Sequence, residues 1–344
     1  MISESQLEQV LSAAAGMTVA LVGDLFLDRY LEVESSVEEI SIETGLEAYQ
    51  VNHVRNAPGA LGTVMNNLAA LGIGGLVPVT VIGDDGHGHD LLKSLSALPA
   101  DPQHILQDAK RLTPTYTKPM RTSAEGNRRE LNRLDVKSRG PIEPGTRQEL
   151  LIRLEAAFED CDALIVLDQV AEPDWGVVHQ EVRALLAQLA ERHPERLIFV
   201  DSRAQIGEFS CGVLKPNQPE CLRAAGFRTA AANDKVPEAV EKLARRTGRP
   251  VFCTLGSEGM LVAENHGRTA HVPGIPISGP IDIVGAGDSA TAGIVTALCA
   301  GASSIQAAAL GNLVASITIQ QLGVTGVATP DQLRTRRARI WPSS

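Results

Sequence analysis

The stretch Met17-Thr-Val-Ala-Leu-Val-Gly23 is an apolar run that ends at a glycine. Such a run is typical of a strand buried on both faces of a parallel sheet. Two carboxylates, Asp24 and Asp28, follow it directly, so we expect them just past the C-terminal end of the first strand. Ligands bind at that edge in open α/β sheets, although an Asx-turn is a structural alternative for Asp24.

Apolar strand patterns and helical patterns alternate through the rest of the chain. We predict strands at residues 76–82, 163–167, 197–200, 212–214 and 251–254, and helices at 90–97, 175–192, 219–225, 237–247 and 304–322. A further helix is expected to follow the Pro58-Gly59 turn and to end at Gly72. This alternation indicates βαβ units and a parallel sheet. Polar residues follow several of these strands, namely Asp168, Asp201, Asn217, Glu220 and Thr254. Each one alone could be a cap or a turn residue, but together they predict a polar site at one sheet edge.

Two stretches do not fit the main sheet. Residues 31–55 are acidic and mix polar with β-branched residues, and residues 113–136 contain two strand-like pieces. We predict that they form a small lid of β-strands inserted in a single domain that spans 1–344. Exposed sheets often pair with a partner's copy, so we expect a homodimer through the lid. The arginines of the second piece, Arg121, Arg128, Arg129 and Arg133, would hold a substrate phosphate or form a solvated charged face.

A second informative stretch is Asp282-Ile-Val-Gly-Ala-Gly-Asp288, which precedes an apolar, small-residue helix pattern. Gly285 and Gly287 allow the backbone to turn so that several N–H groups converge, and the helix N-terminus favours an anion. Asp288 stands at the same place. A carboxylate beside an anion site is explained if it accepts a proton from a hydroxyl that attacks a phosphate. The alternative is that Asp288 simply caps the helix.

A second anion site is predicted at Thr254-Leu-Gly256-Ser-Glu-Gly259, which offers N–H groups and a hydroxyl after a strand. Asn217 and Glu220, three residues apart, offer oxygen ligands for Mg²⁺ carried with a nucleotide. Two anion sites, a magnesium pair and a base between them describe phosphoryl transfer. The Gly-x-x-x-x-Gly-Lys-Ser/Thr pattern of a P-loop is absent from the sequence.

Composition restricts the function further. The chain has 344 residues, 44% of them hydrophobic, and a formal net charge of −10, which argues against binding to nucleic acid or anionic membranes. Its five cysteines lack zinc-type or CxxC spacing, and no signal peptide or membrane span is recognisable, so we expect a reduced, cytoplasmic protein. His87 and His89 are interpreted as solvated loop residues instead of metal ligands.

These motifs resemble those of the ribokinase (PfkB) family of carbohydrate kinases. The matching segments are Asp282–Asp288, the nucleotide loop Thr254–Gly259 and the Asn-x-x-Glu motif within Lys215–Glu220. Over residues 17–331 the chain is most similar to the D-glycero-β-D-manno-heptose 7-phosphate kinase branch. The resemblance implies a three-layer α/β/α domain with a mostly parallel central sheet and a small β-sheet lid. It also implies a stand-alone kinase, since the His-x-Gly-His motif of a nucleotidyltransferase is not found in the sequence.

The same resemblance implies roles for individual residues. Asp288 would be the general base, and Gly285, Ala286 and Gly287 the anion hole. ATP with Mg²⁺ would bind at the nucleotide-site residues Asn217, Glu220, Thr254, Gly256, Gly259 and Asn312. The acceptor, a sugar or sugar phosphate, would face Asp24, Asp28, Gly59, Thr63 and Asn67. Carbonyl groups around Asp282 and Val284 would form a monovalent-cation site, such as one for K⁺.

The sugar half departs from the family pattern. The usual Gly-Gly pair is Gly59-Ala60, the usual sugar-binding Asn is replaced by Thr63, and the Lys of the heptose kinases is missing from Asp168-Gln-Val-Ala-Glu172. Hydrogen bonds to substrate hydroxyls carry large selectivity, so these changes leave the substrate open. Two alternatives therefore remain, a non-catalytic sugar or nucleotide sensor and a kinase for a nucleoside or another small alcohol.

Overall fold

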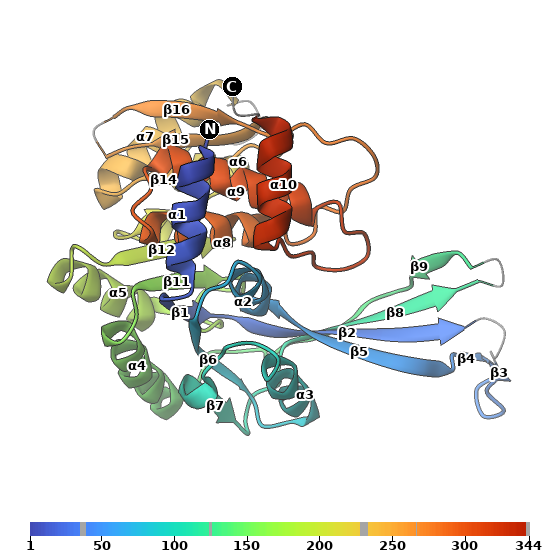
Figure 1. Cartoon of the computed structure of the whole chain (residues 1–344). Coiled ribbons are helices and arrows are strands. Elements are labelled where there is room, and N and C mark those ends of the chain that lie inside the picture. The colour runs from blue at the N-terminus through green and yellow to red at the C-terminus, as the bar shows by residue number, and fades with distance from the viewer. Residues whose placement is uncertain (35–38, 124–125, 228–232, 266, 342–344) are drawn as a thin grey trace.

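The computed structural model describes residues 1–34, 39–123, 126–227, 233–265 and 267–341. Within these residues a nine-stranded central sheet has the order β16-β15-β14-β13-β12-β11-β1-β6-β7 (Figure 1). Its strands are β1 (Thr18–Gly23), β6 (Gly75–Gly83), β7 (Ile105–Asp108), β11 (Ala163–Asp168), β12 (Leu197–Ser202), β13 (Val213–Leu214), β14 (Val251–Thr254), β15 (Gly259–Ala263) and β16 (Thr269–Pro273). The strands from β7 to β14 are parallel, whereas β15 and β16 are antiparallel. The predicted α/β class with a mostly parallel sheet is confirmed.

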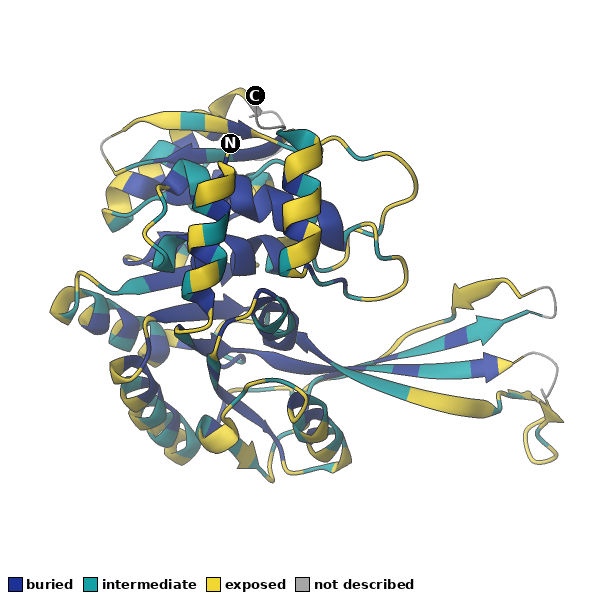
Figure 2. Ribbon diagram, viewed as in Figure 1, coloured by how far each residue is buried: buried dark blue, intermediate teal, exposed yellow. Residues whose placement is uncertain are grey.

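Alternate residues of β1 enter two separate hydrophobic cores. Val19 and Leu21 belong to one core, and Ala20 and Val22 to the other; all four are fully buried. The strands in the middle of the central sheet are drawn mainly in the colour of buried residues in Figure 2. The first core contains residues of α1 (Glu4–Ala14), α2 (Leu61–Ala70), α3 (Gly86–Leu95), α8 (Ala286–Cys299), α9 (Ser304–Thr318) and α10 (Pro330–Ile340). The second contains residues of α4 (Pro144–Glu159), α5 (Gln180–Arg192), α6 (Gln218–Ala224) and α7 (Val236–Thr247). Burial on both faces explains why the first strand is continuously apolar.

A second sheet projects away from this body (Figure 1). We call it the lid sheet; it consists of β2 (Leu25–Glu34), β5 (Val51–Ala60), β8 (Thr115–Thr122), β9 (Arg128–Glu130) and β10 (Leu134–Val136). A short hairpin, β3 (Glu39–Ile40) with β4 (Glu47–Ala48), lies between β2 and β5 in sequence. β2 begins immediately after Asp24, so Asp28 lies on the lid sheet and not in a loop after the first strand. Parts of the predicted lid, residues 35–38 and 124–125, lie outside the described residues.

Several predicted boundaries were wrong. The helix expected at 90–97 begins at Gly86 with Asp85 as its N-cap, so His87 and His89 lie in the first helical turn and not in a loop. The helix expected from Trp175 begins only at Gln180. The last predicted helix ends at Thr318, and α10 follows it. Short 3₁₀ turns occur at Pro102–His104, Ile206–Glu208, Asn233–Lys235 and Gly256–Glu258.

In the part of the chain that the structure describes, no helix is both long and apolar enough to cross a lipid bilayer.

Candidate active site

The start of α8 sets the position of Asp288. Gly285, with φ at +78°, is the N-cap, and Asp288 lies in the first helical turn. The alternative that Asp288 caps the helix is therefore wrong. The N–H of Ala286 already donates to the carbonyl of Ile283 (3.1 Å), which removes it from the predicted anion hole. Gly287 is exposed and lines a cavity with Asp288, so its amide is the better donor for an anion.

Asp288 lies on the wall shared by two cavities. The lid cavity, about 250 Å³, is lined on one side by Phe26, Asp28, Tyr116 and Lys118 of the lid sheet and by Arg133, which immediately precedes β10. The strand-end cavity, about 340 Å³, is lined by residues that follow the central strands, namely Asp201, Lys215, Asn217, Glu220 and Thr254. Gln169, Arg203 and Gly285 also line both. The carboxylate therefore faces two spaces that could each hold one substrate.

The surroundings of Asp288 allow its carboxylate to exchange protons near neutral pH. Burial and the nearby Asp201 carboxylate raise the pKa of Asp288 to about 7, while the cations of Lys215 and Arg203 act in the opposite direction. A carboxylate with its pKa near the working pH is suited to general base catalysis. Asp168 also has a pKa raised to about 7, through burial and the proximity of Asp24.

A buried ion pair lies beneath the start of α8. The ammonium of Lys215 lies 2.8 Å from Asp201, and both side chains are buried. Thr291 donates to the same Asp201 carboxylate (3.3 Å). A Cβ atom at Gly287 would lie 3.6 Å from Lys215 Nζ, so this ammonium lies next to the anion-binding turn, and both residues line the strand-end cavity. Because a buried charge needs a partner, Asp201 holds Lys215 in its charged form.

Asn217 and Glu220 form a reciprocal cap at the start of α6. The Asn217 side chain accepts from the Glu220 N–H (2.9 Å), and the two Glu220 oxygens accept from the N–H and the side-chain amide of Asn217 (both 2.8 Å). Burial raises the pKa of Glu220. The predicted pair is thus adjacent and lines the strand-end cavity together with Thr254.

The glycines and the asparagine of the predicted nucleotide site differ in their surroundings. Gly256 has φ at +62° and open space where a Cβ would lie, which permits close approach of a ligand. At Gly259 a Cβ would lie 2.2 Å from the carbonyl of Val272, so this glycine is required by strand packing. The Asn312 side chain donates to the carbonyls of Val272 (3.2 Å) and Pro273 (3.1 Å), which attaches α9 to β16. Its predicted contact with the nucleotide stays a prediction.

The predicted sugar residues fall into two groups. Asp28 and Thr63 line the lid cavity, and Asp28 pairs with Lys118 at 2.9 Å. Gly59 lies behind Asp28, where a Cβ would come within 2.5 Å of the carboxylate. Asn67, by contrast, is fully buried and donates to the carbonyls of Thr63 (3.0 Å) and Gly326 (3.4 Å), so the structure does not bring it to the lid cavity wall.

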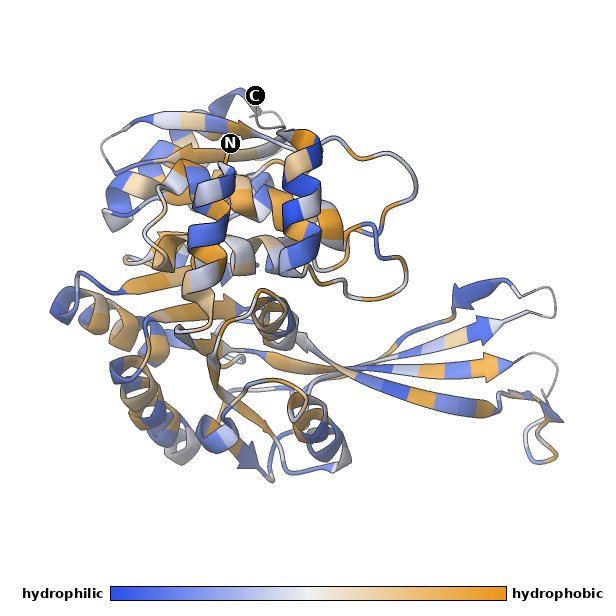
Figure 3. Ribbon diagram, viewed as in Figure 1, coloured by the Kyte–Doolittle hydropathy of each residue, from blue (hydrophilic) through white to orange (hydrophobic). Residues whose placement is uncertain are grey.

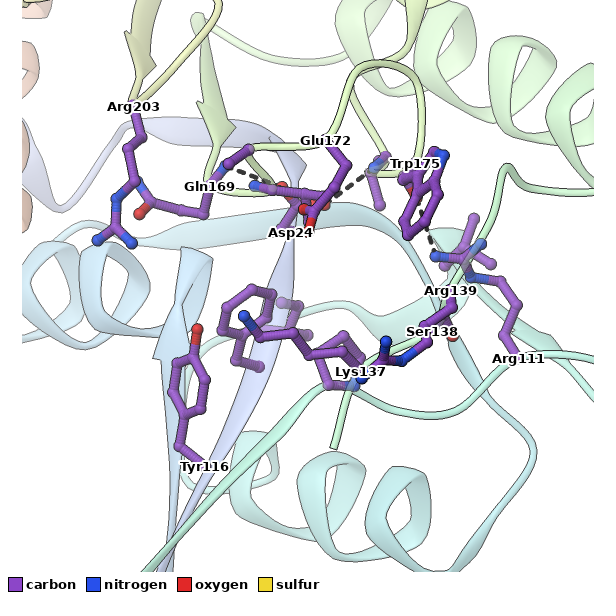
Figure 4. Close-up of a pocket in the computed structure, with 17 residues that line it drawn as sticks. Asp24, Arg111, Tyr116, Lys137, Ser138, Arg139, Gln169, Glu172, Trp175 and Arg203 are labelled. Carbon is purple, nitrogen blue, oxygen red and sulfur yellow. Dashed lines mark hydrogen bonds between the residues drawn. The ribbon is translucent and has the colours of Figure 1, made fainter. Parts of the chain in front are cut away.

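Asp24 organises a loop. Its two carboxylate oxygens accept hydrogen bonds from the backbone N–H groups of Gln169 (2.8 Å), Val170 (3.1 Å) and Val177 (2.9 Å). Burial raises its pKa although these bonds oppose the shift. This loop and Asp24 line a third, outer cavity of about 280 Å³ (Figure 4). Asp24 therefore positions this loop, and its predicted contact with the sugar stays a prediction.

The loop before α8 is fixed by Asp282. Its carboxylate accepts from the N–H of Val284 (3.0 Å) and of Gly323 (3.3 Å). Ile283 and Val284 are exposed beside it. The carbonyl groups around Asp282 and Val284 remain the predicted monovalent-cation site.

Sequence comparison decides the family. A match to the pfkB family carbohydrate kinases spans residues 18–331. The chain belongs to this family. The bifunctional protein HldE of Caulobacter sp. (strain K31) is 31% identical over 327 residues, which cover 93% of this chain and 63% of that protein. HldE of Azorhizobium caulinodans is 29% identical over 93% of this chain and 64% of its own length. The chain thus spans slightly less than two thirds of these relatives.

Solved structures share the fold of this pfkB-family chain. Phosphofructokinase-2 from Escherichia coli, in complex with substrates and products, has a TM-score of 0.70 at 18% identity, covering 94% of this chain and 99% of its own. Ribokinase from Arabidopsis thaliana, complexed with ribose and ATP, has a TM-score of 0.64 at 17% identity, covering 95% and 99%. At this identity the likeness shows the common fold.

Several residues that line the lid cavity or the strand-end cavity were not predicted as site residues from the sequence. They are Gln169, Arg203 and Lys215 at strand ends, Tyr116 and Lys118 on β8, and Thr325 in the loop after α9. Lys215 precedes the Asn-x-x-Glu motif at the end of an apolar strand, a position where a lysine needs a buried partner, and that signal could have identified it. The lid residues carried no comparable signal, because the lid is brought to the site only by the fold.

Proposed function

We propose that the protein transfers the γ-phosphate of ATP to a hydroxyl group of a sugar or sugar phosphate, with Asp288 as the general base. The observation that carries this proposal is the position of Asp288 on the wall between two cavities, with its pKa raised to about 7. The acceptor occupies the lid cavity and the terminal phosphates of ATP the strand-end cavity. The pfkB family match supports the kinase function, and the predicted nucleotide-site residues Asn217, Glu220 and Thr254 in the strand-end cavity support the assignment of ATP to that cavity.

In this mechanism the acceptor hydroxyl gives its proton to Asp288 as its oxygen attacks the γ-phosphorus. The Gly287 amide and the N-terminus of α8 stabilise the negative charge of the phosphoryl group. Within the Lys215–Asp201 pair, the ammonium lowers the pKa of Asp288 and the Asp201 carboxylate raises it, so Lys215 is the member of the pair that limits the basicity of Asp288. Phosphoryl transfer is catalysed mainly by positioning the substrates and neutralising charge. The groups named above can do both.

The donor set around Asn217 fits Mg²⁺ that arrives with the nucleotide. Each oxygen of Glu220 accepts one hydrogen bond, which leaves further lone pairs on the strand-end cavity side for water ligands of the ion. Among the described residues no group of three or more acidic, His or Cys side chains forms a dedicated metal cage, as is usual for Mg²⁺ bound mainly through phosphates and water. When bound, the ion neutralises phosphate charge. K⁺ at the carbonyls of Asp282 and Val284 would order the loop before Gly285.

The acceptor is proposed to contact Asp28 and Thr63. The Asp28–Lys118 pair presents a hydrogen-bond acceptor and a donor side by side, which suits vicinal sugar hydroxyls. Phe26 and Tyr116 line both the lid cavity and the outer cavity, and we propose that an acceptor larger than a pentose extends from one into the other.

The Asp288→Asn variant tests the proposal. We expect it to bind ATP with nearly unchanged affinity and to lose two to four orders of magnitude in kcat, about the contribution of a general base. ADP release should be measured over a panel of heptose 7-phosphate, ribose, fructose and nucleosides, and ATP binding by calorimetry. Near-normal turnover in the variant would exclude Asp288 as the base, and silence of the wild type across the panel would favour a sensor.

We also propose that two copies pair through the lid. The lid sheet and its hairpin expose large apolar side chains, namely Ile40, Leu46, Val51, Val54 and Leu134, each between 44% and 69% exposed. Apolar residues are visible along the lid strands in Figure 3. A projecting sheet with unpaired edges and exposed apolar groups is stabilised when a second copy covers it.

A further inference from the structure

Arg203 occupies a position that the roles assigned above do not explain. It follows β12, and its side chain lines the lid cavity, the strand-end cavity and the outer cavity. Its backbone is fixed on both sides: the N–H donates to the carbonyl of Asp168 (3.0 Å), and the carbonyl accepts from Arg223 (3.1 Å). Figure 4 shows Arg203 and Tyr116 at one end of the outer cavity and Arg111 and Trp175 at the other.

Arg203 is exposed, and its guanidinium has no hydrogen bond or ion pair to any of the described residues, even though acidic groups lie close to it. The neighbouring cations are already engaged. Lys215 pairs with Asp201, Lys118 with Asp28, and Arg133 with Asp135. Arg203 is therefore the cation of this wall that has all its donors available for a ligand.

We propose that Arg203 is a catalytic residue whose guanidinium binds the phosphoryl group while it passes from the nucleotide to the acceptor. This inference rests on the proposed kinase function. In the step, the bond between the γ-phosphorus and the β,γ-bridging oxygen breaks, and its electron pair leaves with ADP. The acceptor oxygen forms the new bond to phosphorus, and its proton moves to Asp288. Arg203 does not change its protonation state.

The chemistry of the guanidinium fits this step. Its planar donors match two phosphoryl oxygens at once, and it remains charged at all working pH values. The phosphoryl group crosses from one cavity to the other at the wall that Arg203 shares with Asp288. An arginine that contacts the phosphoryl group in the transition state contributes a factor of about 10³ to 10⁵ in kcat in other phosphoryl-transfer enzymes.

Arg203 also acts on the base. Its positive charge lowers the pKa of Asp288, in opposition to burial and Asp201. Loss of this charge should move the acid limb of the pH profile to higher pH. This shift tests whether the charge of Arg203 lies close to Asp288, and contact with the phosphoryl group needs a separate test.

ADP with Mg²⁺ and fluoroaluminate, a mimic of the phosphoryl group in transit, tests the proposal without knowledge of the acceptor. Arg203→Gln should leave the Kd of ADP within about threefold of the wild type and weaken the fluoroaluminate complex at least a hundredfold. Arg203→Lys should recover part of the loss, because it restores charge but not the planar donors. Arg245→Gln, which removes an exposed arginine of α7 paired with Glu241, is the matched control and should behave as wild type.

The remaining outcomes separate the explanations. If Arg203→Gln raises only the KM of the acceptor and leaves kcat and the fluoroaluminate complex unchanged, Arg203 is an acceptor anchor and the proposal fails. If ADP affinity and Tm fall together, its role is structural and the proposal fails. If the wild type itself does not form the ADP–fluoroaluminate complex, the kinase function is wrong, which is a different result from the loss of that complex in the variant alone.

Discussion

The carboxylate of Asp288 lies among charges of both signs, and this determines how activity should depend on pH. Because its pKa is raised to about 7 and a general base must be deprotonated, we expect kcat/KM to rise about tenfold per pH unit below 7 and to level above it. A flat profile between pH 5 and 8, measured with saturating ATP and Mg²⁺, would contradict this assignment.

Over the same pH range the free energy of unfolding should change in the direction opposite to that of activity. This provides a control for the pH profile of kcat/KM. Asp168 and Asp288 both have folded-state pKa values near 7, above the value of about 3.9 expected in the unfolded chain. The folded state therefore binds more protons between pH 4 and 7, and this contribution to the free energy of unfolding falls as pH rises. An activity that rises while Tm falls cannot result from unfolding at low pH.

For single residues, local motifs in the sequence predicted which residues gather at one cavity, but contacts between residues distant in sequence were not predicted. Asn217, Glu220 and Thr254, which were expected at strand ends, line the strand-end cavity, and Asp288, which was expected at the start of a helix, lines it as well. Asp24 has the same kind of position, yet its oxygens are occupied by the backbone of residues 169–177, about 145 residues away in sequence. That loop conformation depends on tertiary contacts and leaves no pattern in the sequence.

The turn before α8 is the element most sensitive to a small change. At Gly285, φ is +78° and a Cβ would lie 2.8 Å from Thr325 Cγ2; at Gly301, φ is also +78° but the space is open. We expect both Gly285→Ala and Gly301→Ala to lose about 1–2 kcal/mol through the left-handed backbone alone. Gly285→Ala should lose more, because Thr325 must move, and should also lower kcat. The Tm and kcat of the two variants are compared by thermal melts and kinetics. Equal effects of the two substitutions would argue against strain in the turn at Gly285.

At the level of elements, apolar strands were predicted well because burial on both faces leaves a continuous signal. β15 and β16 were missed: the first follows β14 after a short turn that was interpreted only as a phosphate-binding loop. The start of α5 was placed five residues too early, since residues 175–179 belong to the loop held by Asp24. α4 also escaped prediction; its buried residues, such as Leu150 and Leu154, are few among many polar ones.

For the molecule as a whole, the proposed lid dimer makes a clear prediction. The double substitution Val54→Glu with Leu134→Glu places charges in the exposed apolar surface of the lid and should convert a dimer into a monomer with little change in Tm, because both side chains are exposed. Ile152→Glu, an equally exposed apolar position on α4, is the control and should remain dimeric. Light scattering after size-exclusion chromatography measures the mass; a monomeric wild type at micromolar concentration would overturn the proposal.

The position of β1 between β6 and β11 also matters during synthesis of the chain. The Thr18 N–H donates to the carboxylate of Asp162, 144 residues later, where β11 begins. At a translation rate of about 5–20 residues per second, one edge of β1 stays unpaired for roughly 7 to 30 s, until β11 has been synthesised. During that interval a fully apolar strand is open on one side, and parallel pairing is slow to form. We therefore expect that a chaperone that shields the nascent β1 strand would increase the yield of folded protein.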